Sequence, residues 1–238
     1  LLIRFLETTR NSDGGYGNTP GAASALASTK DALYALGYLG ANVEKAPVER
    51  YIQSLFDKES GLFAATPGGK GAIGSTAQAL EALQVLAVLD KEVYTKMFPK
   101  INAALTAAKK TEGGVSSFTF ADNTVHGANY FGIITGYFTG FEFGALSQWA
   151  PYFTRLQTTR GAFSDMKGEP SLEATYYSLQ ALSYLERAFA KSKSVQVSNI
   201  DNKTLLRFIL RATPLDLNVI GRLVFVLADT AAFQELFA

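Results

Sequence analysis

The chain repeats one design four times: a turn that contains glycine, followed by a helix with one apolar face. The clearest copy begins with a turn at residues 161–165 and continues into residues 171–185, where apolar residues recur every three or four positions. Ser171 is a suitable N-cap, and Glu173 lies in the first turn, where the helix dipole favours a negative charge. The repetition predicts an all-α protein built from helical units.

The spacing of the copies limits the kind of repeat. The equivalent glycines are Gly15, Gly61, Gly114 and Gly161, which lie 46, 53 and 47 residues apart. This period is longer than the about 34 residues of a common helix-pair repeat, and no copy shows the signature of a propeller blade. Each copy therefore has room for two helices and one glycine turn.

Aligning the four helices predicts a shared register. Two apolar positions recur and are expected in the core: Leu33, Leu80, Phe131 and Leu179 at the first, and Leu36, Leu83, Ile134 and Leu182 at the second. Small residues recur at the helix starts: Thr29, Thr76, Gly127 and Thr175. Close packing and capping explain these small residues; alternatively, this end of each helix faces a shared central space.

Helical periodicity predicts about ten helices in a single domain that spans residues 1–238. They are expected at residues 1–9, 31–39, 48–56, 75–89, 91–109, 123–140, 143–156, 171–190, 202–211 and 215–237. We expect Pro99 to bend or interrupt its helix and Pro214 to separate the last two. Residues 115–120 are expected to form a loop rather than a strand, and Lys109 and Lys110 to lie in a solvated loop. Because the chain does not begin with methionine, we expect it to be a fragment of a longer protein.

Composition limits the partners. The net charge of +1 gives no electrostatic case for binding nucleic acid. The absence of cysteine excludes disulfides and cysteine chemistry. No apolar run approaches the roughly 20 residues of a membrane-spanning helix, since residues 217–227 are interrupted by Asn218, Gly221 and Arg222. We therefore expect no nucleic-acid partner and no membrane span in this fragment.

Glycine turns that precede apolar helices at a period near fifty resemble those of the α/α-toroid superfamily. That superfamily includes protein prenyltransferase β subunits, squalene and terpene cyclases, and the thioester domains of complement-like proteins. The resemblance implies inner helices around a central axis, with outer helices around them. It implies an α/α toroid of about five helical hairpins, short of the usual six, and leaves open whether the toroid is complete.

The catalytic signatures of that superfamily are missing from the sequence. Prenyltransferases hold zinc with Asp, Cys and His, whereas this chain has no cysteine and one histidine. The Asp-x-Asp-Asp motif of squalene cyclases and the Cys-Gly-Glu-Gln core of thioester domains do not occur. These absences predict a chain that is not an enzyme, with no catalytic residue, no cofactor and no metal site.

Within the superfamily, two stretches resemble the ribophorin II family, specifically its lumenal N-terminal domain. They are residues 28–36 and the last glycine turn with the start of its helix, residues 161–163 and 172–175. The resemblance implies a non-catalytic scaffold that supports N-glycosylation within the oligosaccharyltransferase complex. It also implies location in the lumen of the endoplasmic reticulum, with other subunits of that membrane complex or glycoprotein substrates as partners.

A different function stays open: an isoprenoid-binding or terpene-cyclase- or prenyltransferase-like enzyme. It predicts a central apolar cavity with at least one carboxylate at its floor, and a cytoplasmic location is the alternative to the lumen. A toroid that binds carbohydrate or peptide is a third possibility, for which the sequence carries no separate signal.

Candidate cavity or interface residues come from the third and fourth copies of the repeat: His126, Asn129, Tyr130, Tyr137, Tyr176 and Tyr177. His126, the only histidine, is a general acid or base near neutral pH or, alternatively, a structural capping residue. The aromatic-rich segment 130–143 lines an apolar cavity or belongs to the core. Asn202 begins a glycosylation sequon, which matters only in a secretory compartment.

Overall fold

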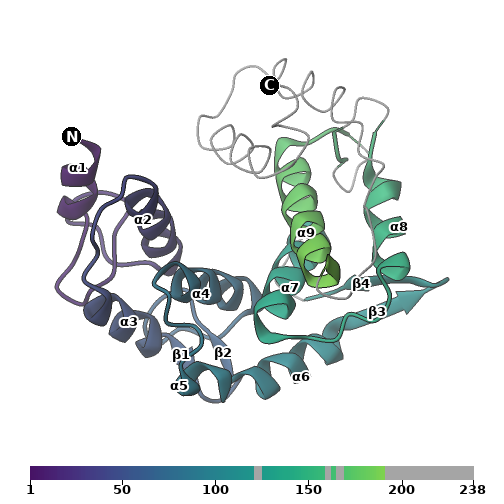
Figure 1. Cartoon of the computed structure of the whole chain (residues 1–238), viewed down its shortest axis with the longest axis horizontal. Helices are drawn as coiled ribbons and strands as arrows, with labels where there is room; N and C mark the ends of the chain where they lie inside the picture. The colour runs from purple at the N-terminus through teal and green to yellow at the C-terminus, as the bar shows by residue number, and fades with distance from the viewer. Residues whose placement is uncertain (121–124, 159–161, 165–168, 191–238) are drawn as a thin grey trace. The chain divides into compact units, whose positions relative to one another are not determined.

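A computed structural model describes residues 1–120, 125–158, 162–164 and 169–190 (Figure 1). They form two compact units. Unit 1 comprises Leu1–Ala107 and Phe138–Gly140, and unit 2 comprises Ala108–Tyr137 and the described residues from Phe141 onward. The predicted helices at 202–211 and 215–237 lie outside the described residues, as does Asn202.

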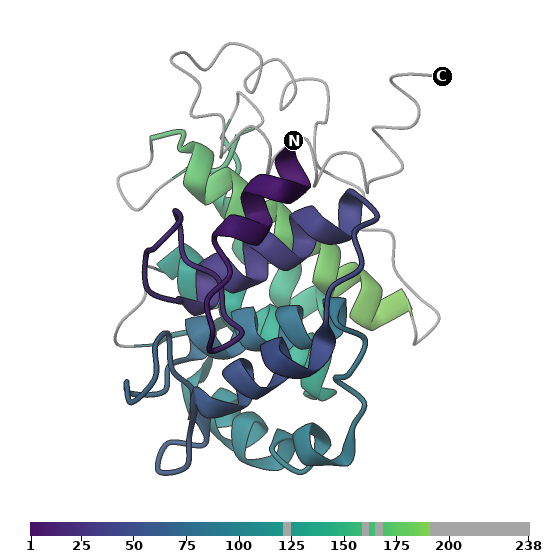
Figure 2. The ribbon, with the colours of Figure 1, turned by 90° about the vertical axis from the view of Figure 1, so that its left-hand side faces the viewer.

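Unit 1 contains helices and one short hairpin. The elements are α1 (Leu2–Thr8), α2 (Leu26–Tyr38), α3 (Lys45–Ser54), β1 (Phe56–Asp57), β2 (Leu62–Phe63), α4 (Ile73–Val85), α5 (Glu92–Thr95) and most of α6 (Phe98–Ala108). Helix α2 packs against α4, α3 packs against α4, and α1 lies across α2 (Figure 2). The end of α7 belongs to this unit, and there the Thr139 hydroxyl donates to the side-chain oxygen of Asn102.

The core of unit 1 lies between α2, α3 and α4. Leu33 and Leu36 of α2 pack in one buried cluster with Leu80 and Leu83 of α4. Burial of each leucine side chain contributes about 1.5–3 kcal/mol. The register predicted for these two copies is therefore confirmed. In α1, by contrast, the apolar side chains of Leu2 and Phe5 are exposed.

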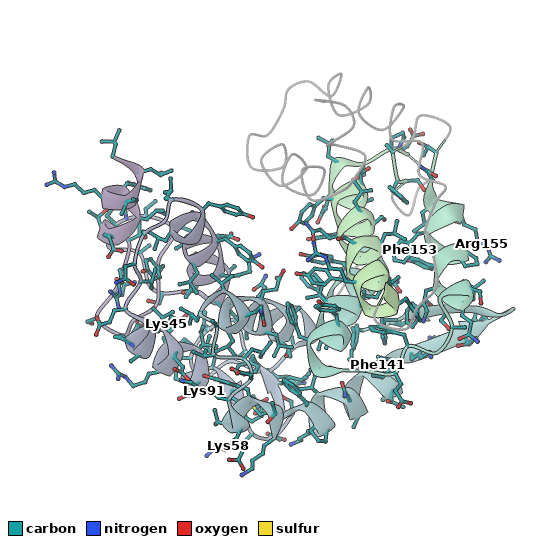
Figure 3. All side chains as sticks on the ribbon, viewed as in Figure 1. Lys45, Lys58, Lys91, Phe141, Phe153 and Arg155 are labelled. Atoms are coloured by element: carbon teal, nitrogen blue, oxygen red, sulfur yellow. The ribbon has the colours of Figure 1, made fainter. Side chains whose placement is uncertain are left out.

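Unit 2 contains a longer hairpin and three helices. The elements are β3 (Lys109–Glu112), β4 (Val115–Phe118), α7 (Val125–Thr139), α8 (Leu146–Leu156) and α9 (Leu172–Ala190). Strand β4 and helix α9 both pack against α8. Phe153 of α8 is buried (Figure 3). Phe118 of β4 contacts Trp149 of α8, with ring centroids 4.9 Å apart.

Two glycines of α7 make room for the aromatic core of unit 2. A Cβ atom at Gly132 would lie 2.5 Å from the Phe118 ring, and one at Gly136 would lie 2.6 Å from the Phe143 ring. Both distances are shorter than real carbon atoms tolerate, so the helix must carry glycine at these two positions. The predicted core position at Phe131 is only half-buried, whereas Ile133 and Ile134 are fully buried.

Each glycine turn brings an aromatic residue back to the end of the preceding helix. The antiparallel pairs are Arg10 with Tyr16, Phe56 with Phe63, Lys109 with Phe118, and Gln157 with Phe163. The aromatic side chains that follow the turns are at most 1% exposed: Tyr16, Phe63, Phe118 and Phe163. The repeat is therefore an outgoing helix, a tight hairpin, a buried aromatic residue and a second helix, and we call α2, α4, α7 and α9 the repeat helices.

A threonine near the start of three repeat helices fixes this hairpin. In unit 1, Thr76 Oγ1 accepts the N–H of Phe63 at 3.0 Å and donates to the carbonyl of Ala72 at 2.8 Å. Thr29 does the same for Tyr16 and Ala25, and Thr175 for Phe163 and Ser171. The predicted close approach at these positions is confirmed, and its cause is a hydrogen bond to the backbone.

The third copy makes the same contact with a different residue. Asn129 Oδ1 accepts the N–H of Phe118 at 2.8 Å. The equivalence predicted for Gly127 is therefore wrong by two positions. The side-chain oxygen of asparagine lies one bond farther from the backbone than the hydroxyl of threonine. Asn129, two positions beyond the predicted one, can therefore reach the Phe118 N–H.

Two loop predictions are wrong. Residues 115–118 form β4 rather than a loop, because alternate side chains, Ser116 and Phe118, are buried and face the core. Lys109 and Lys110 belong to β3. The Lys109 ammonium donates to the Phe143 carbonyl at 3.0 Å, so that lysine is tied to the core.

The predicted break near Pro99 is confirmed. Helix α5 ends at Thr95 and α6 starts at Phe98, which places Pro99 in the first turn, where its missing N–H costs no hydrogen bond. Every helix among the described residues is too short or too polar to cross a bilayer.

Candidate functional site

The observed repeat places tyrosines of α7 and α9 at equivalent positions along the two helices of unit 2. Tyr130 and Phe131 follow Asn129, and Tyr176 and Tyr177 follow Thr175. Asn129 and Thr175 make equivalent hydrogen bonds to their hairpins, so the two pairs of rings occupy equivalent positions on their helices. The rings are indeed in contact across the two helices.

The four rings form one cluster. Tyr130 stacks on Tyr177 with centroids 4.7 Å apart and an angle of 27° between the planes. Tyr130 also lies 5.7 Å from Tyr176, and Phe131 lies 5.8 Å from Tyr177. The hydroxyl oxygens of Tyr130 and Tyr176 are 3.3 Å apart and share a hydrogen bond.

A second contact lies two helical turns farther along the same helices. Tyr137 follows Tyr130 by seven residues and Tyr184 follows Tyr177 by seven, and seven residues correspond to about two turns. The Tyr137 and Tyr184 rings meet edge to face at 5.1 Å. The Arg187 guanidinium lies 5.6 Å from the centroid of the Tyr184 ring.

We call the six side chains on α7 and α9 the aromatic strip: Tyr130, Phe131, Tyr137, Tyr176, Tyr177 and Tyr184. Tyr130 is 3% exposed, while Phe131, Tyr137, Tyr176 and Tyr177 are half-buried. The rings therefore brace one another and still offer surface to a ligand. Aromatic faces bind apolar chains, and their quadrupoles attract cations.

Asn129, which precedes Tyr130 of the aromatic strip, has a structural role. Its side chain is fully buried, and its amide oxygen is occupied by the Phe118 N–H. Burial raises the pKa of Tyr152 on α8 to about 12, and a hydrogen bond with the Asn129 side chain opposes part of that rise. Asn129 thus joins β4, α7 and α8.

The structure brings Tyr130, Tyr176 and Tyr177 into contact and pairs Tyr137 with Tyr184. That these residues line a cavity or an interface stays a prediction. His126 lies in the first turn of α7, and its role as an acid, a base or a cap stays a prediction. Tyr184 was not among the predicted residues, although the seven-residue step from Tyr177 was a usable signal.

A buried carboxylate in unit 1 was also missed. Glu81 is the one charged residue in the α4 sequence and is 6% exposed. Removing a carboxylate from water is costly unless its surroundings satisfy it, so such a group on a repeat helix is a functional candidate. Its isolation within an otherwise uncharged helical segment was the available signal.

The described residues do not supply a metal site. Zinc needs several nitrogen, sulfur or carboxylate ligands in one place. Within the part of the chain that the structure describes, no group of three or more His, Cys, Asp or Glu side chains is arranged to hold a metal ion.

Comparison with known proteins identifies the kind of domain. A family model described as the prenyltransferase alpha-alpha toroid domain matches residues 1–139 and 141–218. The predicted fold class, all-α and α/α toroid, is therefore confirmed. No curated protein matches the chain in sequence.

A solved structure of a variant of the type II terpene cyclase MstE from Scytonema, in complex with its substrate geranylgeranyl dihydroxybenzoate, is similar to this chain. The two are 16% identical with a TM-score of 0.45, over 98% of this chain and 75% of the cyclase.

The family match corrects one prediction and leaves another without support. The prediction of a chain that is not an enzyme is contradicted, because the matching family model is of the prenyltransferase type. The missing motifs exclude only the reactions that need those motifs. They do not exclude a reaction that uses aromatic rings or a buried glutamate. A resemblance to ribophorin II is not shown, and the lumenal location and the partners stay predictions.

Proposed function

Because the chain belongs to the prenyltransferase α/α-toroid domain family, we propose that it binds an isoprenoid and acts as a cyclase- or prenyltransferase-like enzyme. The observation that carries the proposal is the aromatic strip. Four of its rings contact one another on α7 and α9, and a further pair lies two turns away. The strip thus extends for roughly 10 Å along the helices.

The strip suits both the substrate and the chemistry. An isoprenoid chain is apolar and gains free energy when its surface leaves water. Cyclisation and prenyl transfer develop positive charge on carbon, and the π faces of tyrosine and phenylalanine attract such charge without donating a nucleophile. In this proposal the strip positions the chain and stabilises the developing cation.

Ligand binding tests the role of the strip. We expect Tyr177→Ala to weaken the binding of geranylgeraniol to the full chain by roughly tenfold, the effect of about 1.4 kcal/mol of lost contact. The matched control is Phe5→Ala, which removes an exposed aromatic side chain from α1. Equal affinity of both variants and the original chain would contradict the proposed binding surface.

Turnover tests the enzymatic part separately. The chain is incubated with geranylgeranyl diphosphate and with geranylgeranylated aromatic acids, and the products are identified by mass spectrometry. We expect Tyr177→Ala to lower turnover together with geranylgeraniol binding, whereas Phe5→Ala should leave both unchanged. Binding with no turnover of any of these compounds would leave a binding domain and reject the enzyme.

A further inference from the structure

The β3–β4 hairpin of unit 2 leaves one strand edge open within the part of the chain that the structure describes. Its turn is formed by Gly113 and Gly114, whose φ angles of 55° and 78° suit a two-residue type I′ turn. Such a turn makes Glu112 and Val115 a hydrogen-bonded pair, and every second pair along the ladder is then hydrogen-bonded as well. Thr111 lies between two such pairs, so its N–H and C=O point away from β4.

Hydrogen bonds at both ends of the hairpin agree with this alternation. The Thr119 N–H donates to the Ala108 carbonyl at 3.0 Å, which is the spacing that the turn requires. Among the described residues, no hydrogen bond uses the outward N–H or C=O of Thr111. On the opposite edge, by contrast, the Phe118 N–H of β4 donates to Asn129 Oδ1. The edge of β3 is therefore the one available to a further strand.

The outer face of β3 carries two opposite charges, Lys110 and Glu112. Both side chains are exposed, on the face of the hairpin opposite to the buried Ser116 and Phe118. Neither charge has an ion-pair partner among the described residues. A lysine on an edge strand commonly keeps another strand away. An antiparallel copy of this strand, however, presents its glutamate to that lysine, so the edge is complementary to itself.

We infer that β3 pairs antiparallel with β3 of a second copy of this chain, with Thr111 opposite Thr111 of the partner subunit. In this register the two threonines exchange two backbone hydrogen bonds, and Lys110 lies opposite Glu112 of the partner subunit on both sides of them. The neighbouring registers that keep the hydrogen bonds set lysine opposite lysine or glutamate opposite glutamate, so repulsion opposes both. The two hairpins form one antiparallel sheet around a twofold axis. This inference does not depend on the proposed isoprenoid function.

Sedimentation equilibrium of the full chain at low salt tests the pairing. The four residues of β3 bury little surface, so we expect a weak dimer with a Kd of roughly 0.1 mM. Lys110→Glu places like charges at both contacts and should raise the Kd about tenfold or more. Glu112→Lys should have the same effect. Because both side chains are exposed, circular dichroism should show an unchanged fold in each variant.

Complementation separates edge pairing from a general effect of charge. The double variant, with Lys110→Glu and Glu112→Lys in one chain, has opposite charges at both contacts again and should recover the original Kd. An equimolar mixture of the two single variants should form a heterodimer, because one strand is then negative at both positions and the other positive. The matched control is Lys45→Glu, which makes the same change of net charge at an exposed position of α3 and should leave the Kd unchanged (Figure 3).

Three outcomes would overturn the inference. A chain that stays monomeric up to about 1 mM does not pair with itself, which leaves the edge to a strand of another protein. A dimer whose Kd is the same in Lys110→Glu as in the original chain uses a different surface. Weaker dimers in both single variants, without recovery in the double variant or in the mixture, would reject the register centred on Thr111.

Discussion

At the scale of single residues, the Asp57 carboxylate organises the second glycine turn. Oδ2 accepts the Ser60 hydroxyl at 2.7 Å and the Gly71 N–H at 3.1 Å, and Oδ1 accepts the Glu59 N–H at 3.0 Å. These donors, led by Ser60, lower the pKa of Asp57 to about 2. The carboxylate therefore joins the two ends of a glycine-rich loop that ends where α4 begins.

The lowered pKa predicts an acid-dependent loss of stability. A carboxyl whose pKa is lower in the folded chain stabilises the fold above its unfolded pKa of about 3.9, and that contribution disappears as pH falls towards 2. We expect Asp57→Asn to be less stable than the original chain at pH 7, with the difference vanishing near pH 2. Thermal unfolding followed by circular dichroism across this range measures it. A difference that is constant with pH would show that charge at Asp57 is irrelevant.

At the scale of elements, the hydrogen bond from the hairpin to the repeat helix is the unit of construction. Thr76 is fully buried, and its hydroxyl satisfies the N–H of Phe63, which is buried as well. The same arrangement at Thr29, Thr175 and Asn129 links each repeat helix to its hairpin. Loss of one acceptor would leave a buried donor without a partner.

We predict that Thr76→Val destabilises the chain by about 1–3 kcal/mol, the cost of an unsatisfied buried N–H. Valine keeps the volume of threonine and has a methyl group in place of the hydroxyl. Thr76→Ser is the matched control, because it keeps the hydroxyl and loses a methyl group, at about 0.8 kcal/mol. The free energy of unfolding in urea compares the two. A valine variant as stable as the serine variant would remove the hydrogen bond as the reason for threonine here.

An element was predictable from the sequence when the interactions that define it join residues close together in the chain. Helical periodicity and Pro99 act within a few residues, so the helices and the break before α6 were predictable. The start of α2 was predicted at residue 31 and lies at Leu26, whose N–H donates to the carbonyl of Ala65 in a distant loop. No local pattern contains that contact. Strand β4 was missed because four residues are too few for a clear alternation.

The candidate site was predictable only as a set of residues. The richness in tyrosine pointed to Tyr130, Tyr176 and Tyr177, but the predicted register, wrong by two positions in the third copy, set Tyr130 level with Ser178 rather than with Tyr176. The stacking of Tyr130 on Tyr177 depends on how α7 and α9 pack, which periodicity does not encode. Glu81 was missed because its burial results from α2 and α3 packing on α4.

At the scale of the whole molecule, buried tyrosines connect folding to alkaline pH. Burial is the main cause of a raised pKa at four of them: Tyr16, Tyr51 and Tyr94 in unit 1 and Tyr152 in unit 2. For Tyr51 and Tyr152 the pKa rises to about 12. The unfolded chain, in which tyrosine ionises near pH 10, therefore gains charge before the folded chain does.

We predict that the chain loses stability steeply between pH 10 and about pH 12. A group whose pKa is raised by folding contributes its full stability below pH 10 and loses it as pH approaches the folded value, at up to about 1.4 kcal/mol per pH unit for each tyrosine. Melting temperatures at rising pH measure the loss, and tyrosinate absorbance reports ionisation. Tyr51→Phe should make the decline shallower, whereas Tyr38→Phe, at an exposed position, should not. Ionisation of all tyrosines near pH 10 while the chain stays folded would contradict this coupling, because buried hydroxyls cannot ionise at their ordinary pKa without the fold opening.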